Sequence, residues 1–224
     1  MTRIYLLIDS LGSGGAQRQL VGLAALLKER GYEVIVGYYH PIRFYRPFLD
    51  ENGVHSELIY GAESKGMRIW CVRRSIKAFR PDIVISYLDK PNIIACLLRA
   101  TGMKFRLITS ERNTTQEYSF HECIKFALMH WADIVVPNSF SQKKFICEHF
   151  PRLAPKVTTI TNFVDTDAFS PASQSKSRNP ECKLRLLVVG RVTKQKNVMR
   201  FLQAVKRLRD EGYLFFVDWY GYSG

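Results

Sequence analysis

Short runs of apolar, often β-branched residues alternate along this chain with longer amphipathic stretches, and this alternation constrains the fold more than any other feature. The first run is Arg3 to Ile8 and the second is Glu33 to Tyr38, with an amphipathic stretch, Ala16 to Arg30, between them. Strands that alternate with helices in this way are typical of βαβ units, in which helices connect the strands of a parallel sheet. The sequence therefore predicts an α/β fold built on a doubly wound parallel sheet.

The same pattern continues for most of the chain. Further strands are expected at Ser56–Tyr60, Asp82–Tyr87, Arg106–Ser110, Asp133–Pro137 and Lys156–Thr161, and further helices at Gly66–Phe79, Asn92–Ala100, Ser119–Trp131 and Phe140–His149. Residues 1–162 are therefore interpreted as one Rossmann-like domain.

A segment rich in Pro, Ser, Asn and Lys then interrupts the rhythm, and we interpret residues 163–182 as a hinge or linker. The pattern restarts with a strand at Leu184–Val189, a helix at Asn197–Arg209 and a strand at Leu214–Tyr220. Residues 183–224 thus resemble the first β-α-β of a second Rossmann-like domain. A piece of this size does not close a core of its own, so this second domain is expected to be incomplete.

The chain is strongly basic, with 33 Lys and Arg against 20 Asp and Glu and a net charge of +13. Such an excess indicates an anionic partner: a nucleic acid, a nucleotide or phosphorylated substrate, or a membrane surface with acidic lipids. Helix-turn-helix, RRM and zinc signatures are missing from the sequence, which disfavours nucleic acid. The five cysteines are odd in number and form no C-x-x-C pair, so reduced thiols in a cytosolic protein are expected. The first apolar run is too short for a signal peptide or a membrane span, so any membrane contact is expected to be peripheral.

A glycine-rich turn separates the first strand from the first helix. Gly14 and Gly15 lie in this turn, where backbone N–H groups at a helix N-terminus can approach a phosphate. The third position of a G-x-G-x-x-G fingerprint is Gln17, and no acidic residue ends the second strand, so an NAD-type site is disfavoured. The alternative is that the glycines serve only the geometry of a tight turn.

Arg191 and Lys196 stand between the first strand and the helix of the second domain. A guanidinium just past a strand end and an ammonium at the next helix start can clamp a diphosphate. The alternative is an ordinary solvated pair of basic residues.

The predicted helix Gly66–Phe79 carries a basic face. Trp70 lies on that face, flanked by Arg73, Arg74 and Lys77. Cations beside an aromatic ring suit contact with an anionic membrane surface, and the alternative is an ordinary solvated helix face.

Glu111 and Arg112 follow a predicted strand end, at the edge of an α/β sheet where ligands usually bind. The pair is suited to orienting sugar hydroxyls or a phosphate, and the alternative is a surface ion pair. The histidines have no Asp or Cys at metal or triad spacing, so no metal site is expected.

Four ordered segments carry a resemblance to one family: GGAQRQL, VPNSFSQKKF, ITNFVDTDAFSP and LLVVGRVTKQKN. Together they closely resemble the GT-B fold glycosyltransferases of family 4, the retaining group 1 transferases. The resemblance implies a two-domain enzyme in which the N-terminal domain, residues 1–162, binds the acceptor and the C-terminal domain, which starts at residues 183–224, binds the nucleotide sugar. Such an enzyme moves a hexose from a UDP- or GDP-type nucleotide sugar to a glycan or lipid-linked glycan in polysaccharide or glycoconjugate synthesis. It also implies a metal-independent enzyme without a cofactor, cytoplasmic or peripheral on the inner face of the cytoplasmic membrane.

The resemblance assigns roles residue by residue. Arg191 and Lys196 match the catalytic pair that grips the donor diphosphate and stabilises the leaving group by charge. Gly14 and Gly15 match the loop facing that diphosphate, and Glu111 with Arg112 matches an acceptor-side loop of members that extend lipid-linked oligosaccharides.

The chain departs from the family pattern in several places. Phe163 and Asn197 replace usual glycines, and Leu88 and Asp89 stand where many members place a His. The family's two donor-binding glutamates lie beyond the last residue of this sequence. The alternative to an enzyme is therefore a non-catalytic truncated module that binds acceptor or membrane and lacks the donor site.

Overall fold

The structure, a computed structural model, describes residues 1–62, 64–113, 119–171, 184–193 and 196–221. The chain folds as two compact units, Met1–Asp165 and Thr166–Gly224.

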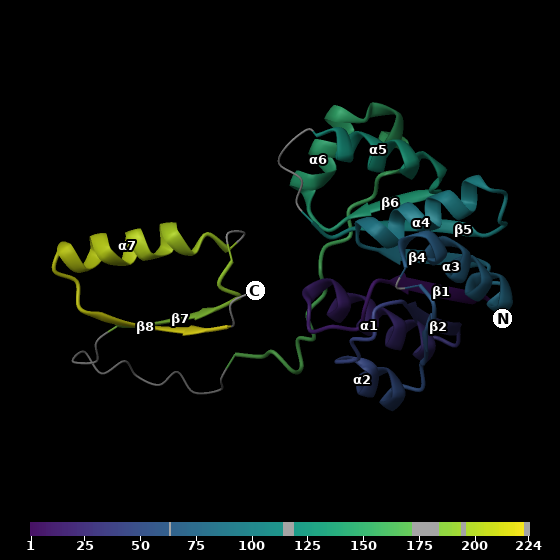
Figure 1. Ribbon diagram of the computed structural model, residues 1–224. Helices are drawn as coiled ribbons and strands as arrows, with labels where there is room; N and C mark the ends of the chain where they lie inside the picture. The colour runs from purple at the N-terminus through teal and green to yellow at the C-terminus, as the bar shows by residue number, and fades with distance from the viewer. Residues whose placement is uncertain (63, 114–118, 172–183, 194–195, 222–224) are drawn as a thin grey trace. The chain divides into compact units, whose positions relative to one another are not determined.

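The first unit is built on a six-stranded sheet in which every strand pairs in parallel with its neighbours (Figure 1). The strands are β1 (Arg3–Ile8), β2 (Glu33–Tyr38), β3 (His55–Leu58), β4 (Ile83–Tyr87), β5 (Arg106–Glu111) and β6 (Ile134–Pro137). Their spatial order is β3-β2-β1-β4-β5-β6. The order reverses between β1 and β4, and in open α/β sheets this reversal marks the place where ligands bind.

Helices cover both faces of this sheet. Against one face pack α1 (Gly15–Glu29) and α2 (Arg46–Glu51); against the other pack α3 (Lys65–Phe79), α4 (Asp89–Ala100), α5 (Phe120–Leu128) and α6 (Phe140–His149). Short 3-10 helices, η1 (Met129–Trp131) and η2 (Pro151–Lys156), follow α5 and α6. Because both faces are covered, the strands are apolar on both sides, as parallel sheets require.

Alternate residues of β1 show how the two cores arise. Ile4, Leu6 and Ile8 join the core under α1, while Tyr5 and Leu7 join the core under α3 and α4. Successive side chains of a strand point to opposite faces, so one strand supplies both cores.

Most of the predicted elements are confirmed, and one strand is wrong. Lys156–Thr161 forms no strand: Lys156 ends η2, and Val157 makes only an isolated bridge to Val135. The segment touches β6 through two further bonds, from the Thr158 and Ile160 N–H groups to the carbonyls of Val135 and Pro137, and then leaves the sheet. The short helix α2 was not expected from the sequence, and the predicted helix Ser119–Trp131 divides into α5 and η1.

The second unit contains the expected β-α-β: strands β7 (Leu184–Val189) and β8 (Phe215–Tyr220) pair in parallel and are connected by α7 (Val198–Asp210). Phe201 of α7 packs edge-on against Trp219 of β8, with ring centroids 5.4 Å apart. Within the described part of the chain, no residue of α7 is buried. The helix and the two strands therefore leave much apolar surface open.

None of the helices in the described part of the chain is long and apolar enough to cross a membrane. Among the same residues, no group of three or more His, Cys, Asp or Glu side chains is arranged to hold a metal ion.

Candidate functional site

The glycine loop after β1 lies at the point where the strand order reverses. Gly14 is the N-cap of α1 and Gly15 its first residue. Among the described residues, no side chain caps this helix, and a Cβ at Gly15 would meet nothing within 4 Å. A Cβ at Gly14 would meet only the Gln17 side chain. Residues 13–15 are exposed beside the first amides of α1, and the binding of a phosphate at this loop stays a prediction.

The loop after β2, residues 39–45, is hydrogen-bonded to the backbone that precedes the glycine loop. The N–H groups of Tyr39 and His40 donate to the Asp9 carbonyl at 3.1 and 2.8 Å, and the Leu11 N–H donates to the Ile42 carbonyl at 3.0 Å. The Tyr45 N–H in turn donates to the Leu11 carbonyl at 3.0 Å. These bonds fix the backbone that enters the glycines, which lowers the entropy cost of binding an anion there.

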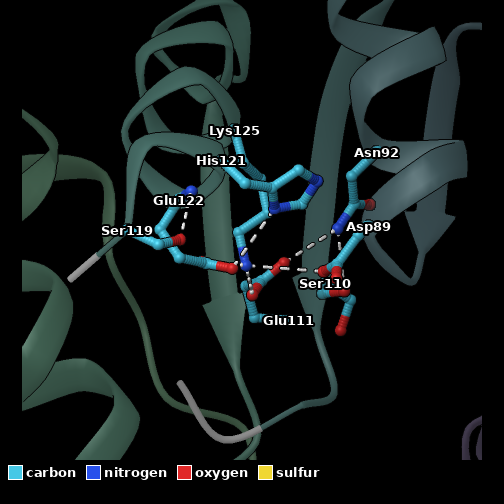
Figure 2. A network of polar contacts seen from close by, with 8 residues as sticks. All are labelled: Asp89, Asn92, Ser110, Glu111, Ser119, His121, Glu122 and Lys125. Carbon is cyan, nitrogen blue, oxygen red and sulfur yellow. Dashed lines mark hydrogen bonds and ion pairs between the residues drawn. The ribbon is translucent and has the colours of Figure 1, made fainter. Parts of the chain in front are cut away.

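Glu111 lies at the carboxyl end of β5 and has no exposed surface (Figure 2). One carboxylate oxygen accepts from the Lys125 Nζ at 2.9 Å, and the other accepts from the Asn92 Nδ2 at 3.3 Å. Asn92 also donates to the Ser110 carbonyl and accepts from the Ser86 hydroxyl. The side chain predicted to bind an acceptor is therefore held inside the domain by partners on α4 and α5.

Lys125 is the hub of this buried network. Its ammonium, almost fully buried, lies 2.9 Å from Glu111, 2.6 Å from Glu122 and 3.5 Å from Asp89. His121 contacts Glu122 from the outer side at 3.5 Å. Three carboxylates thus surround one ammonium, and Asp89, at the start of α4, has the most exposed carboxylate of the three, at 29%.

The network shifts the titration of its buried members. Burial raises the pKa of the Glu111 carboxyl to about 7, against the opposing charge of Lys125 and with added repulsion from Asp89. Burial lowers the pKa of Lys125, but the attraction of Glu111 and its neighbours more than offsets this and holds the pKa above its usual value. The ammonium is therefore retained at neutral pH, while Glu111 titrates there.

Leu88, immediately before Asp89, adopts a backbone conformation that is rare for a residue with a side chain. Its φ is 77° and its ψ 159°, a region populated almost only by glycine. Such strain costs on the order of 1–3 kcal/mol and persists only where the surroundings impose it. It directs the chain from β4 into α4 and places Asp89 at the carboxyl edge of the sheet, one strand from the glycine loop.

Arg112 links this edge of the sheet to the segment that leaves the domain. Its guanidinium stacks 4.1 Å from the Tyr87 ring centroid, donates to the Tyr87 hydroxyl and donates to the Asn162 side chain at 2.9 Å. Its loop continues into residues 114–118, which are outside the described residues. The predicted partner Glu111 faces inward, so the two neighbours have different surroundings.

Arg191 and Lys196 lie in the second unit, in the turn after β7, and both are exposed. The turn is fixed from below: the Gly190 N–H donates to the Tyr220 carbonyl at 2.9 Å, and the Trp219 indole donates to the Gly190 carbonyl at 2.7 Å. The Lys196 side chain folds back over Gly190, 4.0 Å from where a Cβ would stand. Lys194 and Gln195 are outside the described residues. Gly14 and Gly15 belong to the first unit.

Sequence reasoning missed Lys125, Asn92 and Asp89 as parts of the site. A signal was present, since Glu122, Lys125 and Met129 share one helix face at i, i+3 and i+7, and Met129 is buried. A lysine on a buried face requires a carboxylate partner, which Glu111 supplies.

The fold is that of the GT-B glycosyltransferases, which are the chain's neighbours among solved structures. The structure of Anabaena Alr3699/HepE in complex with UDP-glucose matches 98% of this chain and 69% of its own, with a TM-score of 0.72 and 15% identity.

The chain belongs to glycosyltransferase family 4, because the model of that family, "Glycosyltransferase Family 4", matches residues 13–168. Two curated relatives from Campylobacter jejuni are similar over almost the whole chain. One, GalNAc-alpha-(1->4)-GalNAc-alpha-(1->3)-diNAcBac-PP-undecaprenol alpha-1,4-N-acetyl-D-galactosaminyltransferase, is 28% identical over 93% of this chain; the other, N-acetylgalactosamine-N,N'-diacetylbacillosaminyl-diphospho-undecaprenol 4-alpha-N-acetylgalactosaminyltransferase, is 25% identical over 94%. The chain spans 58% and 61% of the lengths of these relatives.

Proposed function

We propose that this protein transfers a hexose, with retention of configuration, from a nucleoside diphosphate sugar to a hydroxyl of a glycan or lipid-linked glycan. The observation that carries the proposal is the uncapped glycine loop at the reversal of strand order, within the region matched by a glycosyltransferase family. The names of two relatives describe transfer to lipid-linked glycans, and one structural neighbour holds UDP-glucose, which supports a UDP-type donor; a GDP-type donor is the alternative.

The proposed roles follow from charge and position. Arg191 and Lys196 are the cations that would bind the donor diphosphate and neutralise the charge that develops as it leaves. The exposed amides after Gly14 are proposed to bind a phosphate group. We propose that these two cations supply this stabilisation without a metal ion, and we expect transfer to continue in EDTA.

The buried network is proposed to support the acceptor side. Glu111 and Lys125 are positioning residues in this proposal, since neither is exposed. Through the contact of Lys125 with Asp89, they hold the start of α4 at the carboxyl edge of the sheet. Arg112, which stacks on the Tyr87 ring, lies at the same edge. An acceptor glycan would meet Asp89 and Arg112 at this edge.

The experiment that tests the function is a donor and acceptor screen with the complete native protein. Product formation from UDP- or GDP-hexoses onto lipid-linked glycans is expected, and Arg191→Ala and Lys196→Ala should each reduce kcat at least 100-fold, as loss of a charge-stabilising group does. Arg200→Ala, an exposed arginine of α7 in the same unit, is the matched control. Full activity of the Arg191 and Lys196 variants would contradict the site assignment.

A second proposed partner is an anionic membrane surface, supported by the basic flank of α3. Arg73 and Lys77 line a cavity of about 470 Å³ together with Arg80 and Lys104, and Asp82 supplies the one carboxylate among the lining residues described. Four cations against one carboxylate favour a phosphate group. Trp70 and Arg74, also predicted to contact the membrane, are exposed on the same helix but line a different groove, on the side of β3. Retention on vesicles with anionic lipid, lost at high salt, is the expected result, and indifference to lipid charge would contradict it.

A further inference from the structure

A second groove lies on the other flank of α3, between this helix and the edge strand β3. Its volume is about 410 Å³, in the range of pockets that bind small ligands. The lining residues come from the end of β3 and from one side of the helix: Glu57, Leu58, Ile59, Tyr60, Trp70, Cys71, Arg74, Ser75 and Ala78. Because β3 pairs only with β2, the outer side of this strand is open to a ligand.

The groove combines two exposed aromatic rings with a small set of polar groups. Tyr60 is 75% exposed and Trp70 is 55% exposed, although both line a concave surface. The Arg74 guanidinium lies 5.9 Å from the Trp70 ring centroid. Large exposed aromatic rings in a cavity offer flat apolar faces, and ligands that stack on such faces gain contact area at little entropy cost.

The carboxylate of the groove is held in place from below. Glu57 accepts from the Ser75 hydroxyl at 2.7 Å, and Ser75 in turn is 2.6 Å from the buried Tyr5 hydroxyl of β1. This chain of bonds connects the groove to the core of the sheet. A carboxylate fixed in this way is a pre-organised acceptor for ligand hydroxyls.

Charge distinguishes this groove from the basic cavity across the helix. Among the lining residues, one cation, Arg74, is matched by one anion, Glu57. The cavity lined by Arg73, Lys77 and two further cations has a large positive excess. The lining of the groove therefore carries no net charge, and it fits a neutral ligand that has both hydroxyls and an apolar face. A pyranose ring is such a ligand, because its C–H groups form one face and its hydroxyls point outward.

We propose that the groove between β3 and α3 binds a neutral sugar unit of the acceptor glycan, remote from the reacting hydroxyl. Parallel strands end at one edge of a sheet, so Tyr60 lies at the same edge as the glycine loop, two strands and about 10 Å from β1. A glycan of a few residues spans that separation. This assignment rests on the proposed function for its link to transfer, but sugar binding in the groove is measurable without it.

The test is calorimetric titration of the complete native protein with a lipid-free α-1,4-linked N-acetylgalactosamine trisaccharide. Trp70→Ala should weaken binding about tenfold, the loss expected for a stacking aromatic ring. Trp131→Ala is the matched control, because Trp131 is 52% exposed and lines a different cavity; it should change affinity less than twofold. Thermal unfolding of both variants shows whether the fold is retained.

The outcomes separate this inference from the proposed function. If the protein transfers hexose but Trp70→Ala binds the trisaccharide as the unchanged protein does, or if no binding occurs at millimolar saccharide, the groove assignment is overturned. If no donor is used and binding is still lost in Trp70→Ala alone, the groove stands and the transferase proposal fails. If Trp70→Ala alters only retention on anionic vesicles, the ring contacts lipid and the groove assignment is again overturned.

Discussion

Gln19 on α1 binds the backbone of Phe163 through both ends of its side-chain amide. Its Nε2 donates to the Phe163 carbonyl at 2.9 Å, and its Oε1 accepts from the Phe163 N–H at 3.0 Å. These residues are 144 positions apart in the sequence, and the pair fastens the end of the first unit to its first helix. The segment after η2 bonds to β6 as far as Ile160, and Gln19 then binds it to α1 at Phe163.

Replacing Gln19 removes both of these bonds at once. Gln19→Leu keeps the side-chain size and should lower the free energy of unfolding of the first unit by about 1–2 kcal/mol. Exchange of the Phe163 amide proton should accelerate as well. Urea unfolding and amide hydrogen exchange measure the two effects. Gln17→Leu is the control, because Gln17 makes a single 3.3 Å bond to Asp9. Unchanged exchange at Phe163 would show that the bonds do not hold the segment.

Gly22, one turn further along α1, makes room for the Phe163 ring. A Cβ at this position would collide with the ring, although Ala is otherwise favoured over Gly in a helix by about 1 kcal/mol. Gly22→Ala should therefore destabilise the protein, and the same change in a Phe163→Ala background should stabilise it by about 1 kcal/mol. A double-mutant cycle of unfolding free energies gives both values. Equal effects of Gly22→Ala in both backgrounds would contradict the contact.

The contrast between Phe163 and Glu111 shows what sequence could and could not predict. The parallel sheet, its helices and the glycine loop followed from local patterns of apolar residues and glycines, because period and turn chemistry are local. Phe163 was recognised only as a departure from a usual glycine. Gly22 makes room for the Phe163 ring and Gln19 binds its backbone, and both contacts depend on packing between segments far apart in sequence. Likewise, Glu111 and Lys125 are on separate elements, and only the fold shows that they pair inside the core.

Because the pKa of Glu111 is raised on folding, the free energy of unfolding should depend on pH between the unfolded and the folded pKa of this carboxyl. The carboxyl titrates at about 7 in the folded protein and near its ordinary value of 4.5 when unfolded, so the folded state binds the extra proton between these pH values. Stability from this group is therefore complete below about pH 4.5 and is lost as the pH rises through about 7. Glu111→Gln has no such proton to lose. The difference in free energy of unfolding between this variant and the unchanged protein should therefore shift in favour of the variant by on the order of 1–3 kcal/mol from pH 5 to pH 8.

Urea unfolding at pH 5, 6, 7 and 8 measures this difference. Glu29→Gln, at an exposed position near the end of α1, is the control and should give a difference that does not change over the same range. A constant difference between Glu111→Gln and the unchanged protein would mean that Glu111 is ionised throughout, with Lys125 alone setting its state.

Gly15 offers a test of the anion-binding loop that separates binding from folding. A Cβ there would meet no described atom within 4 Å, so Gly15→Ala should leave the melting temperature within about 2 °C of the original. The added methyl would nevertheless occupy space beside the first amides of α1, where we propose that a donor phosphate binds. KM for the nucleotide sugar should therefore rise about tenfold, a loss of about 1.4 kcal/mol. Gly66→Ala is a matched control, because Gly66 also lies in a first helical turn, on α3, with nothing within 4 Å of a Cβ. Steady-state kinetics with the donor as the varied substrate measures the effect. An unchanged KM in Gly15→Ala would mean that the glycine loop serves its own turn geometry rather than a phosphate.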